Sequence, residues 1–595
     1  MLLLLCGLAS AKVIGTKTFS VGYANVSSSA TGVPETGYIT PPAVLVTASG
    51  GTSSGEYPTL KDAFDKINDG THQGIITIAI NASTTESATA VLYQSGYTGS
   101  GGTSGYTTVS VYPTITGLSI SGDLTAPLID LNGADSVTID GRVNASGAVK
   151  DLVISNINVS TTQGTSAIQF INDASANTVK YCTLKGSSTV ATGGILIFGT
   201  TTGTTGNDNN TIDHNDITNA GGNRPRRTLY SIGTGTGTEN SGNTISNNNF
   251  YDFLPYTAIG SGAGIYLNTY NSAWTISDNS FYETTSFAPT SSLAHYAVYV
   301  INTGNNYTIN NNYIGGSAPL CEGTPWTKTN TANNVFQAIY VSTGTGTASN
   351  IQGNTIKNFN YANNGLNGWW GISLAGAGDV NIGTTAGNVI GALTGNESIV
   401  YTSISGAWYG INVNNFTGTI NIRNNSIGAI KTAGETAANS SWLYCIYGSM
   451  TSGTLNIIDN TFGSATTSNS INASSPATGG SQKLHVINIS TGTADCTVSG
   501  NLIANVNHAG TISGTGLSRG ICLSSTSASG KLTVNNNTVR NFSNDNITAS
   551  GSINFEGIYL THTGTSAHTI SGNSVYDISS TKADLAGRCA GGVKG

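Results

Sequence analysis

The sequence predicts an all-β fold, a single right-handed parallel β-helix solenoid with a short N-terminal capping helix. The first observation is a pattern of Ile or Val, two residues, Asn, one residue and an apolar residue, which returns every 31 to 42 residues from about residue 210. The second is a short segment of alternating apolar residues before each copy. The third is the abundance of Ser, Thr, Asn and Gly (77 Gly residues), which favour turns over helices.

The repeat unit consists of three short strands. A strand such as 264–267 (GIYL) is followed by a Gly/Ser/Thr corner, a strand such as 274–276, an Asn corner, a third strand and a variable insertion. Three such strands cannot bury a face alone, but stacked units bury each inward Ile and Val against its copies above and below. A helical solenoid is the alternative, and it fails because the apolar residues alternate instead of following a 3.6-residue period.

The recurring asparagine marks one corner of every repeat. A typical copy is Ile212-x-x-Asn215-x-Ile217, and Cys182 occupies the same position one repeat upstream. Asn tolerates left-handed backbone angles, and stacked side-chain amides can hydrogen-bond along the axis. We therefore predict a structural ladder, not a set of ligands. Its members are Asn215, Asn248, Asn279, Asn312, Asn354, Asn388, Asn425, Asn460, Asn501, Asn537 and Asn573.

The N-terminal part predicts a helix that covers the open end of the stack. Thr59 to Asn68 carries apolar residues at helical spacing, and Thr59-x-x-Asp62 forms a capping box. A cover is expected because exposed strand edges recruit other chains. We assign 45–145 to the cap helix and first coils, and 146–580 to the repeated coils.

The two ends of the chain differ from the repeats. Residues 1–11 indicate a secretory signal peptide that closes on Ala9-Ser10-Ala11; it lacks the usual positive start, which a longer signal would supply. A buried N-terminal strand is the alternative. Residues 12–44 form an N-terminal extension and 581–595 a C-terminal tail. We expect a secreted, extracellular or cell-surface protein without a membrane span, because no later run approaches about 18 apolar residues.

Charged residues are scarce. Only 22 Lys and Arg and 29 Asp and Glu occur among 595 residues, which is 9% charged, against about 25% in an ordinary domain. A net charge of −7 without clustered Lys or Arg excludes nucleic-acid binding. Six cysteines follow the signal, irregularly spaced, and we expect mostly buried thiols. Cys445 and Cys522 lie two coils apart, about 9.6 Å by the stacking distance, too far for a disulfide.

Two segments give the chain a family resemblance. The segment from Tyr57 to Phe64 (YPTLKDAF), the strand after it, and the segment from Val137 to Arg142 (VTIDGR) resemble the opening of right-handed parallel β-helix proteins of the pectate-lyase-like superfamily. More narrowly, the chain resembles large secreted surface proteins of the Bacteroidetes group, over about residues 45 to 580. The resemblance implies the fold. It implies little about activity, because that superfamily includes lyases, glycosidases and adhesins.

Ionisable residues concentrate at one place. The glycosidase motifs of that superfamily, Asn-Thr-Asp, Asp-Asp, Gly-His-Gly and Arg-Ile-Lys, are absent from the sequence, and the histidines show no metal-binding spacing. No cofactor or metal is predicted. The candidate catalytic cluster, which could hold a uronic acid or act on it, consists of Asp213, His214, Asp216, Arg224, Arg226 and Arg227. The alternative is that these residues face solvent on a strand and a loop.

Tyrosines recur at the outward position of the first strand. They predict a broken stripe along the axis, able to stack on sugars or on another molecule, or else covered by the variable loops as a second small core. The predicted binding residues are Tyr266, Tyr299, Tyr340, Tyr447 and Tyr559. Trp370, Tyr409 and Tyr444 precede the inward Ile by two residues, so we place them in the core. The insertions, such as 316–336 and 391–408, fall at one point of the coil and predict a loop-rich binding side.

The function favoured by these observations is structural. We expect a secreted or cell-surface adhesin-like or filament-forming rod that contacts polysaccharides, surface glycans or neighbouring copies through its loops and tyrosines. Hydroxyl-rich loops and sequons such as Asn472-Ala-Ser make glycosylation plausible. The alternative is a polysaccharide lyase or glycoside hydrolase acting on an acidic polysaccharide near Asp213 to Arg227.

Overall fold

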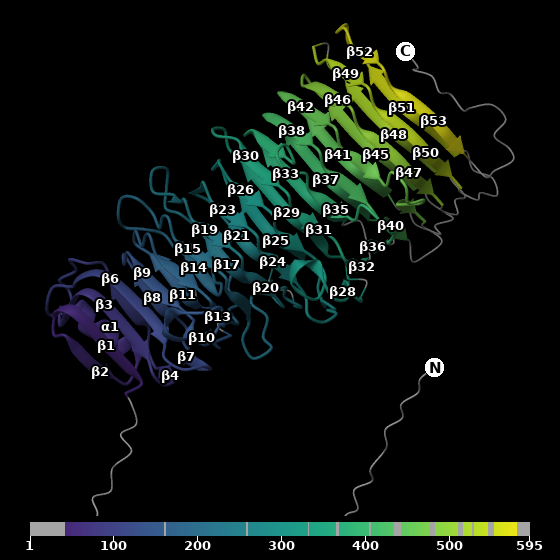
Figure 1. Cartoon of the computed structure of the whole chain (residues 1–595). Helices are drawn as coiled ribbons and strands as arrows, with labels where there is room; N and C mark the ends of the chain where they lie inside the picture. The colour runs from purple at the N-terminus through teal and green to yellow at the C-terminus, as the bar shows by residue number, and fades with distance from the viewer. Residues whose placement is uncertain are drawn as a thin grey trace, which may run out of the picture. The chain divides into compact units, whose positions relative to one another are not determined.

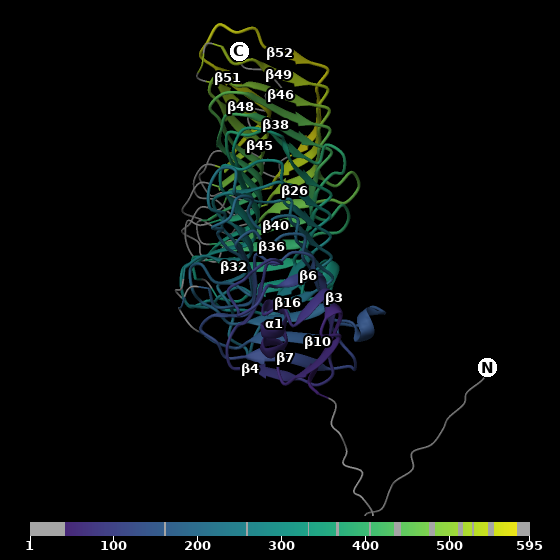
Figure 2. The same cartoon turned by 90° about the vertical axis from the view of Figure 1, so that its left-hand side faces the viewer.

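The computed structural model describes residues 42–579 except 160, 161, 163, 258, 259, 331, 364–367, 404, 405, 434–441, 475–481, 510–515, 526, 528 and 546–552. The predicted signal peptide and C-terminal tail, and residues 12–41 of the predicted extension, lie outside these residues. The described residues form a parallel β-solenoid, as the sequence predicts, with turns that follow one another from the N-terminal to the C-terminal end (Figures 1 and 2).

Each turn contributes one strand to each of three sheets, which we call sheets 1, 2 and 3 in the order of the predicted repeat. Within the described residues, β1 pairs antiparallel with β2 and β3, and the other strand pairings are parallel.

Sheet 1 has 14 described strands. They are β5 (Ala90–Tyr93), β8 (Pro127–Asn132), β11 (Ser166–Ile171), β14 (Leu196–Phe198), β17 (Arg227–Ser231), β21 (Gly262–Leu267), β25 (Ala294–Ile301), β29 (Val335–Thr343), β33 (Trp369–Gly376), β37 (Ala407–Phe416), β41 (Trp442–Met450), β45 (Gln482–Thr491), β48 (Gly516–Ser525) and β51 (Ile553–His562).

Sheet 2 has 17 described strands. They are β1 (Val44–Gly51), β2 (Ser54–Tyr57), β3 (His72–Ile80), β6 (Gly105–Pro113), β9 (Val137–Asp140), β12 (Thr178–Lys180), β15 (Thr211–Asp213), β19 (Thr244–Ser246), β23 (Thr275–Ser277), β26 (Thr308–Asn310), β30 (Ser349–Gln352), β34 (Val380–Ile382), β38 (Thr419–Arg423), β42 (Thr454–Ile458), β46 (Asp495–Ser499), β49 (Leu532–Asn535) and β52 (Thr569–Ser571).

Sheet 3 follows the asparagine corner. Its strands are β4 (Thr84–Glu86), β7 (Leu118–Gly122), β10 (Leu152–Asn156), β13 (Cys182–Gly186), β16 (Asp216–Asn219), β20 (Asn249–Tyr251), β24 (Ser280–Tyr282), β27 (Tyr313–Ile314), β31 (Thr355–Ile356), β35 (Val389–Gly391), β39 (Ser426–Gly428), β43 (Thr461–Gly463), β47 (Leu502–His508), β50 (Thr538–Asn544) and β53 (Ser574–Ser579). Two-residue strands β18 (Asn240–Ser241) and β22 (Asn271–Ser272) pair separately, and η1 (Val143–Ala145) and η2 (Pro319–Cys321) are single 3₁₀ turns.

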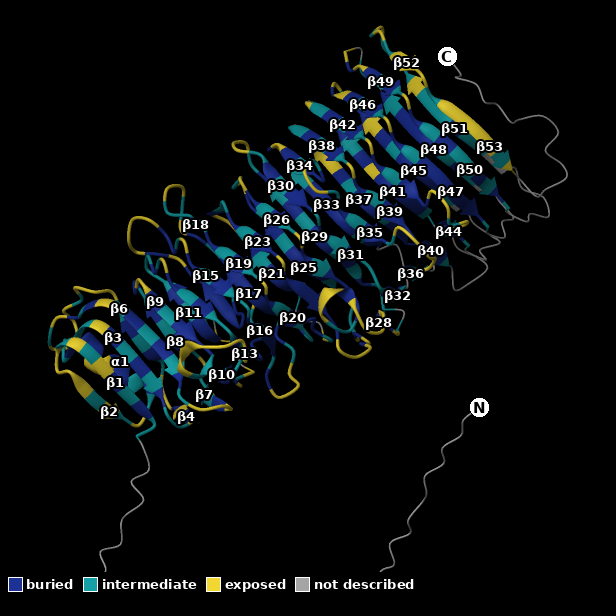
Figure 3. Ribbon diagram, in the orientation of Figure 1, coloured by how far each residue is buried: buried dark blue, intermediate teal, exposed yellow. Residues whose placement is uncertain are grey.

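The core runs along the axis inside the three sheets. In sheet 2, Val179, Ile212, Ile245, Ile276 and Ile309 are in register on successive turns, and all are fully buried. Their outward neighbours are polar and, except for the buried Ser277, half-buried, so buried and half-buried positions alternate along most of these strands (Figure 3). The alternation predicted from the sequence therefore corresponds to one continuous column of aliphatic side chains.

Helix α1 (Leu60–Asn68) begins where the sequence predicts. The Thr59 side chain accepts a hydrogen bond from the backbone N–H of Asp62 at 3.1 Å. The Glu86 carboxylate accepts bonds from the first two helical N–H groups, those of Leu60 (3.1 Å) and Lys61 (3.0 Å), a favourable place for an anion. The apolar face of α1 is formed by Leu60, Ala63, Phe64 and Ile67, which are fully buried in the core cluster of the first turns.

Several insertions that we expect to be loops contain strands. These are β28 (Trp326–Lys328), β32 (Phe359–Asn363), β36 (Ile399–Ser403) and β44 (Ile471–Ala473), and together with β40 (Ile430–Ala433), which lies outside the predicted insertions, they form a second parallel ladder beside sheet 3. This ladder joins β47, whose Val506 pairs with Ile471. Trp326, Phe359 and Tyr401 of the ladder are fully buried, or nearly so. The described strands of the insertions in the middle turns thus widen the core.

The first strand does not alternate strictly, which corrects our placement of three aromatic residues. In β25, Ala297 and Val298 are both in the core cluster, and the same holds for Cys445 and Ile446 in β41. Two successive inward residues turn the preceding residue outward. Trp370, Tyr409 and Tyr444 therefore lie in one column outside the core cluster, where Tyr409 stacks on both of the others, and Trp369 and Trp408 fill the core instead. Trp370 and Tyr409 are half-buried there, whereas Tyr444 is covered and only 3% exposed.

Candidate functional site

The predicted asparagines form a continuous hydrogen-bonded ladder. The Asn215 side-chain N–H donates to Oδ1 of Asn248 at 3.0 Å and to the Val179 carbonyl at 2.9 Å, and the Asn215 backbone N–H donates to the same Oδ1 at 2.8 Å. The pattern continues turn by turn to Asn573, the last member of the predicted series. The amides are occupied by one another and by main-chain carbonyls, which leaves them little capacity to bind a ligand.

The left-handed backbone at this corner belongs to the residue before the ladder asparagine. His214 has φ 56°, Asn247 55° and Asp278 58°, whereas the ladder residues that follow them have no positive φ. The reason for Asn in the ladder is therefore its side-chain amide and not its backbone tolerance, which corrects one of our two expectations.

Further asparagines on successive turns form hydrogen-bonded rows that we did not predict from the sequence. Asn177 donates to Asn210 at 3.0 Å and Asn210 to Asn243 at 3.1 Å, in the buried corner before sheet 2. On the outer face of sheet 2, Asn421 donates to Asn381 at 2.9 Å. The buried row has the same spacing of 33 residues as the predicted ladder, a signal that was present in the sequence.

The candidate catalytic cluster is dispersed over three sheets. Asp213 and His214 lie at the end of sheet 2, where His214 Nδ1 is 2.7 Å from the Asp213 carboxylate. Burial opposes ionisation of Asp213, but bonds from Asn247, Ser246 and His214 outweigh it and lower its pKa. Asp216 lies in sheet 3, and its carboxylate accepts a bond from Lys150 at 2.5 Å. These carboxylates are engaged with structural partners and do not face one another as an acid and base pair.

The three arginines also separate. Arg224 is held by the buried Glu283 carboxylate and by Asp252, whose oxygen is 3.3 Å away. Arg226 donates from Nε to the Ser261 carbonyl at 3.3 Å. Arg227 is the first residue of β17, and its guanidinium lies 4.0 Å from the Tyr266 ring centre and 4.9 Å from that of Tyr230. The sequence cluster thus yields one buried ion pair and, separately, two neighbouring arginines on sheet 1.

The predicted tyrosines share one outward column of sheet 1. The register runs Tyr230, Tyr266, Tyr299, Tyr340, Ser373, Asn412, Tyr447, Asn488, Cys522 and Tyr559. Tyr266 and Tyr299 stack with ring centres 4.7 Å apart and planes inclined by 15°. Of the neighbouring rings in this column, which we call the tyrosine row, only Tyr266 and Tyr299 are stacked; the planes of Tyr230 and Tyr266 are inclined by 53°, and those of Tyr299 and Tyr340 by 64°. The row therefore offers phenol hydroxyl groups for hydrogen bonds and no continuous stacking surface.

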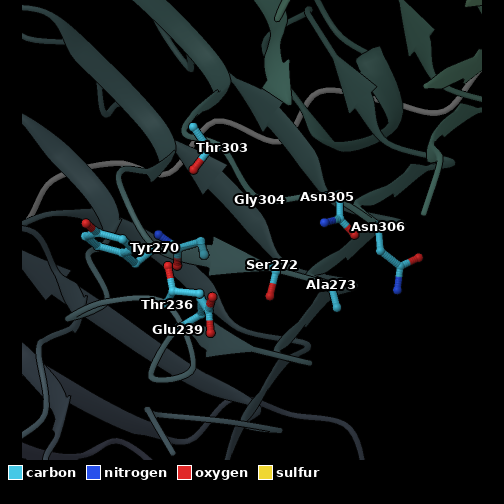
Figure 4. A pocket seen from close by; sticks show the side chains of 10 residues that line it. Thr236, Glu239, Tyr270, Ser272, Ala273, Thr303, Gly304, Asn305 and Asn306 are labelled. Atoms are coloured by element: carbon cyan, nitrogen blue, oxygen red, sulfur yellow. The ribbon is translucent and has the colours of Figure 1, made fainter. Parts of the chain in front are cut away.

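A pocket opens where sheet 1 turns into sheet 2 (Figure 4). Its volume is about 360 Å³, and three successive turns line it. Tyr270, Thr236 and Glu239 lie on one side and Asn305 on the other, with Ser272 between them (Figure 4). Tyr270 is 40% exposed, whereas the neighbouring tyrosines of the row are buried (Tyr230) or half-buried (Tyr266); Tyr447, farther along the row, is 36% exposed. The sequence analysis missed this pocket because its residues come from three loops without a shared motif.

The described cysteines are free and buried. Cys445 points into the core, whereas Cys522 lies in the outward column, and the two strands are separated by β45, as the predicted register requires. In the described part of the chain, no group of three His, Cys, Asp or Glu side chains is arranged to hold a metal. Among the described residues, no helix has the length and apolar composition needed to cross a bilayer.

Comparisons with known proteins find similarity only among solved structures. No protein-family model matches the sequence, and no curated protein matches it. Among solved structures, the chain is similar to the catalytic domain of a GH87 α-1,3-glucanase in complex with nigerose, with 12% identity and a TM-score of 0.24 over 87% of this chain and 67% of that one. A second similar structure is a variant GH87 domain in complex with tetrasaccharides, with 13% identity and a TM-score of 0.21 over the same shares. Scores this low bear on neither activity nor substrate.

Proposed function

We propose that this protein is a secreted or cell-surface β-solenoid that binds glycans without cleaving them, as an adhesin-like component. The observation that carries the proposal is the pocket beside the tyrosine row, with its exposed Tyr270 ring. Ligand sites typically occupy about 300 to 1,000 Å³, and this pocket falls within that range at about 360 Å³.

The chemistry of the pocket suits a sugar. A free aromatic ring stacks on the C–H face of a pyranose, and hydroxyl and amide side chains such as Thr236, Ser272 and Asn305 exchange hydrogen bonds with its hydroxyl groups. Glu239 supplies a carboxylate that accepts from paired hydroxyls.

Binding to soluble polysaccharides tests this proposal. We expect affinity electrophoresis of the full chain against a panel of neutral and acidic polysaccharides to show retardation by at least one of them. Tyr270→Ala removes the free ring and weakens that binding roughly fivefold, since such a contact is worth about 1 kcal/mol. Tyr576→Ala is the matched control, because Tyr576 is 47% exposed in the last described strand, far along the chain from the pocket. Equal binding by both variants contradicts the proposal.

A polysaccharide lyase or hydrolase is the second candidate, and Asp130 is the observation that favours it. Asp130 lies in the same outward column of sheet 1 as the tyrosines. On the turns between them, Asp130 pairs in register with Gln169, Gln169 with Ile197, and Ile197 with Tyr230. Burial raises the pKa of Asp130 to about 6, although a hydrogen bond from Asn132 lowers it in part. One carboxylate oxygen has no hydrogen-bond partner within the described residues. A raised pKa suits a general acid. Release of unsaturated or reducing ends, abolished by Asp130→Asn, would replace the binding proposal by this one.

The cell-surface location and self-association into fibres are part of the same proposal. Its support is the repetitive, weakly charged outer face, which suits contact with a polymer or with neighbouring copies. Electron microscopy of native cell surfaces tests it. Ordered fibres labelled by an antibody to this chain would establish a filament, and dispersed label would establish a monomeric surface protein.

A further inference from the structure

Arg226 and Arg227 are adjacent cations without an acidic partner in the part of the chain that the structure describes. Arg224, two residues earlier, shows the usual arrangement, because the buried Glu283 carboxylate neutralises it. No ion pair of this kind involves Arg226 or Arg227 among the described residues. Two like charges therefore lie side by side at the start of β17.

Burial makes this arrangement costly. Arg227 is only 7% exposed, and its guanidinium contacts the Tyr230 and Tyr266 rings and donates to the Ala191 carbonyl. Burial, and then the charge of Arg226, lower its pKa to about 10, so it stays charged at neutral pH. The aromatic rings offset part of the cost of burying the charge, but they do not neutralise it.

Most of the hydrogen-bond donors of both guanidinium groups have no partner among the residues that the structure describes. Each group carries five N–H bonds. Within the described residues, Arg226 uses Nε for the Ser261 carbonyl, and Arg227 uses Nη1 for the Ala191 carbonyl. The planar fork of a guanidinium matches the two oxygens of a carboxylate or sulfate, and such charge-assisted pairs are the stronger class of hydrogen bond.

The two arginines lie at one end of a polar path that leads to the pocket. β17 carries Tyr230, to whose hydroxyl Asn268 donates at 3.1 Å, and the loops after β17 and β21 line the pocket. The five residues of β17 span about 17 Å, which is the length of several sugar units.

We propose that Arg226 and Arg227 bind the anionic group, a carboxylate or a sulfate, of an acidic polysaccharide whose following sugars run along β17, past Tyr230, to the pocket. The inference rests on the proposed function, and it specifies an acidic polymer as the ligand. Arg226 is the more exposed of the two, and it makes the direct contact. Arg227 lies beneath and adds its charge.

The test uses the full chain with three probes: polygalacturonate, which carries carboxylates, dextran sulfate, which carries sulfates, and neutral dextran. We expect calorimetric titration to show binding of one acidic probe at least tenfold tighter than that of dextran, and the identity of that probe names the anionic group. Arg226→Gln should weaken binding of the acidic probe at least tenfold. The affinity of this variant for the probe should also fall less at high salt than that of the wild type. Arg540→Gln is the matched control, because Arg540 lies in sheet 3 and donates to the Ala465 carbonyl.

The outcomes separate this inference from the proposed function. If Arg226→Gln and Arg540→Gln bind the acidic probe like the wild type, the inference is overturned, and sensitivity to Tyr270→Ala still supports a glycan site. If the wild type binds only neutral polysaccharides, the inference is also overturned while the function stands. If no polysaccharide binds, the proposed function itself fails. Arg226 is only half-buried, so its replacement tests the site even if Arg227→Gln does not fold.

Discussion

The side-chain oxygen of Asn279 accepts two hydrogen bonds from Asn248, one from its backbone N–H and one from its side-chain amide, both at 3.0 Å. The Asn248 amide also donates to the Ile212 carbonyl at 2.8 Å. Each ladder residue therefore joins the turn before it to the turn after it. Because these groups are buried, water cannot replace a missing partner.

Replacing one ladder residue should destabilise the solenoid strongly. Asn279→Ala leaves both Asn248 donors without their acceptor, and each unsatisfied buried group costs about 1 to 3 kcal/mol. We expect the free energy of unfolding in urea to fall by roughly 3 kcal/mol. The control is Asn381→Ala, which removes two half-buried amide bonds on the outer face, one donated to Asn350 and one accepted from Asn421, and should cost about 1 kcal/mol because water can replace both partners. Equal losses for the two variants would mean that the buried ladder contributes nothing special.

Two neighbouring tryptophans test the reversed alternation in sheet 1. Trp369 is fully buried and stacks on Trp408, whereas Trp370 is half-buried and stacks on Tyr409. Trp369→Ala should lower the free energy of unfolding by about 3 to 5 kcal/mol, and Trp370→Ala by a smaller amount. Thermal and urea denaturation measure both variants. The reverse order would restore the orientation predicted from strict alternation.

Buried histidines should make the protein less stable in acid. Burial lowers the pKa values of His295, His485 and His508 to about 3. Between about pH 6.5 and pH 3 the unfolded chain binds protons that the folded chain does not, so stability falls as the pH falls through this window. Each histidine should contribute about 2 kcal/mol to the loss between pH 7 and pH 5.

Denaturation of His508→Gln at both pH values isolates one of these contributions. The difference in stability between pH 7 and pH 5 should shrink by about 2 kcal/mol relative to the wild type. Comparison of His508→Gln with the wild type at pH 7 alone measures the effect of the substitution on packing and serves as the control. An unchanged difference in His508→Gln would contradict burial of the neutral imidazole.

The described thiols should resist modification in the folded protein. Burial raises the pKa values of Cys321 and Cys496 to about 12 and those of Cys182 and Cys445 further, and all five described thiols, Cys522 included, are buried. We expect a thiol reagent at pH 8 to label a Cys589→Ala variant lacking residues 1–11 only after denaturation. Rapid labelling of the native variant would show that the turns open locally.

Part of the candidate site was predictable and part was not. The tyrosine row was predictable, because the tyrosines recur at one outward position of the first strand and every copy of that position has the same place in the register. The position of Trp370 did not follow, because two successive core residues in each first strand reverse the alternation that precedes them. The pocket at Tyr270 was beyond prediction, since loops of different length meet there.

The sequence by itself determined the repeat, the strands and the asparagine ladder, because stacking in register turns a periodic pattern directly into contacts between equivalent residues. Tertiary structure alone decided which ionisable groups meet. It paired Arg224 with Glu283 and Asp216 with Lys150, each from a distant part of the chain, and left Arg226 and Arg227 side by side without a described acidic partner. The reason is physical: hydrogen bonds within the stack repeat with the turns, whereas pairing of charges depends on loop lengths and side-chain burial, which follow no period.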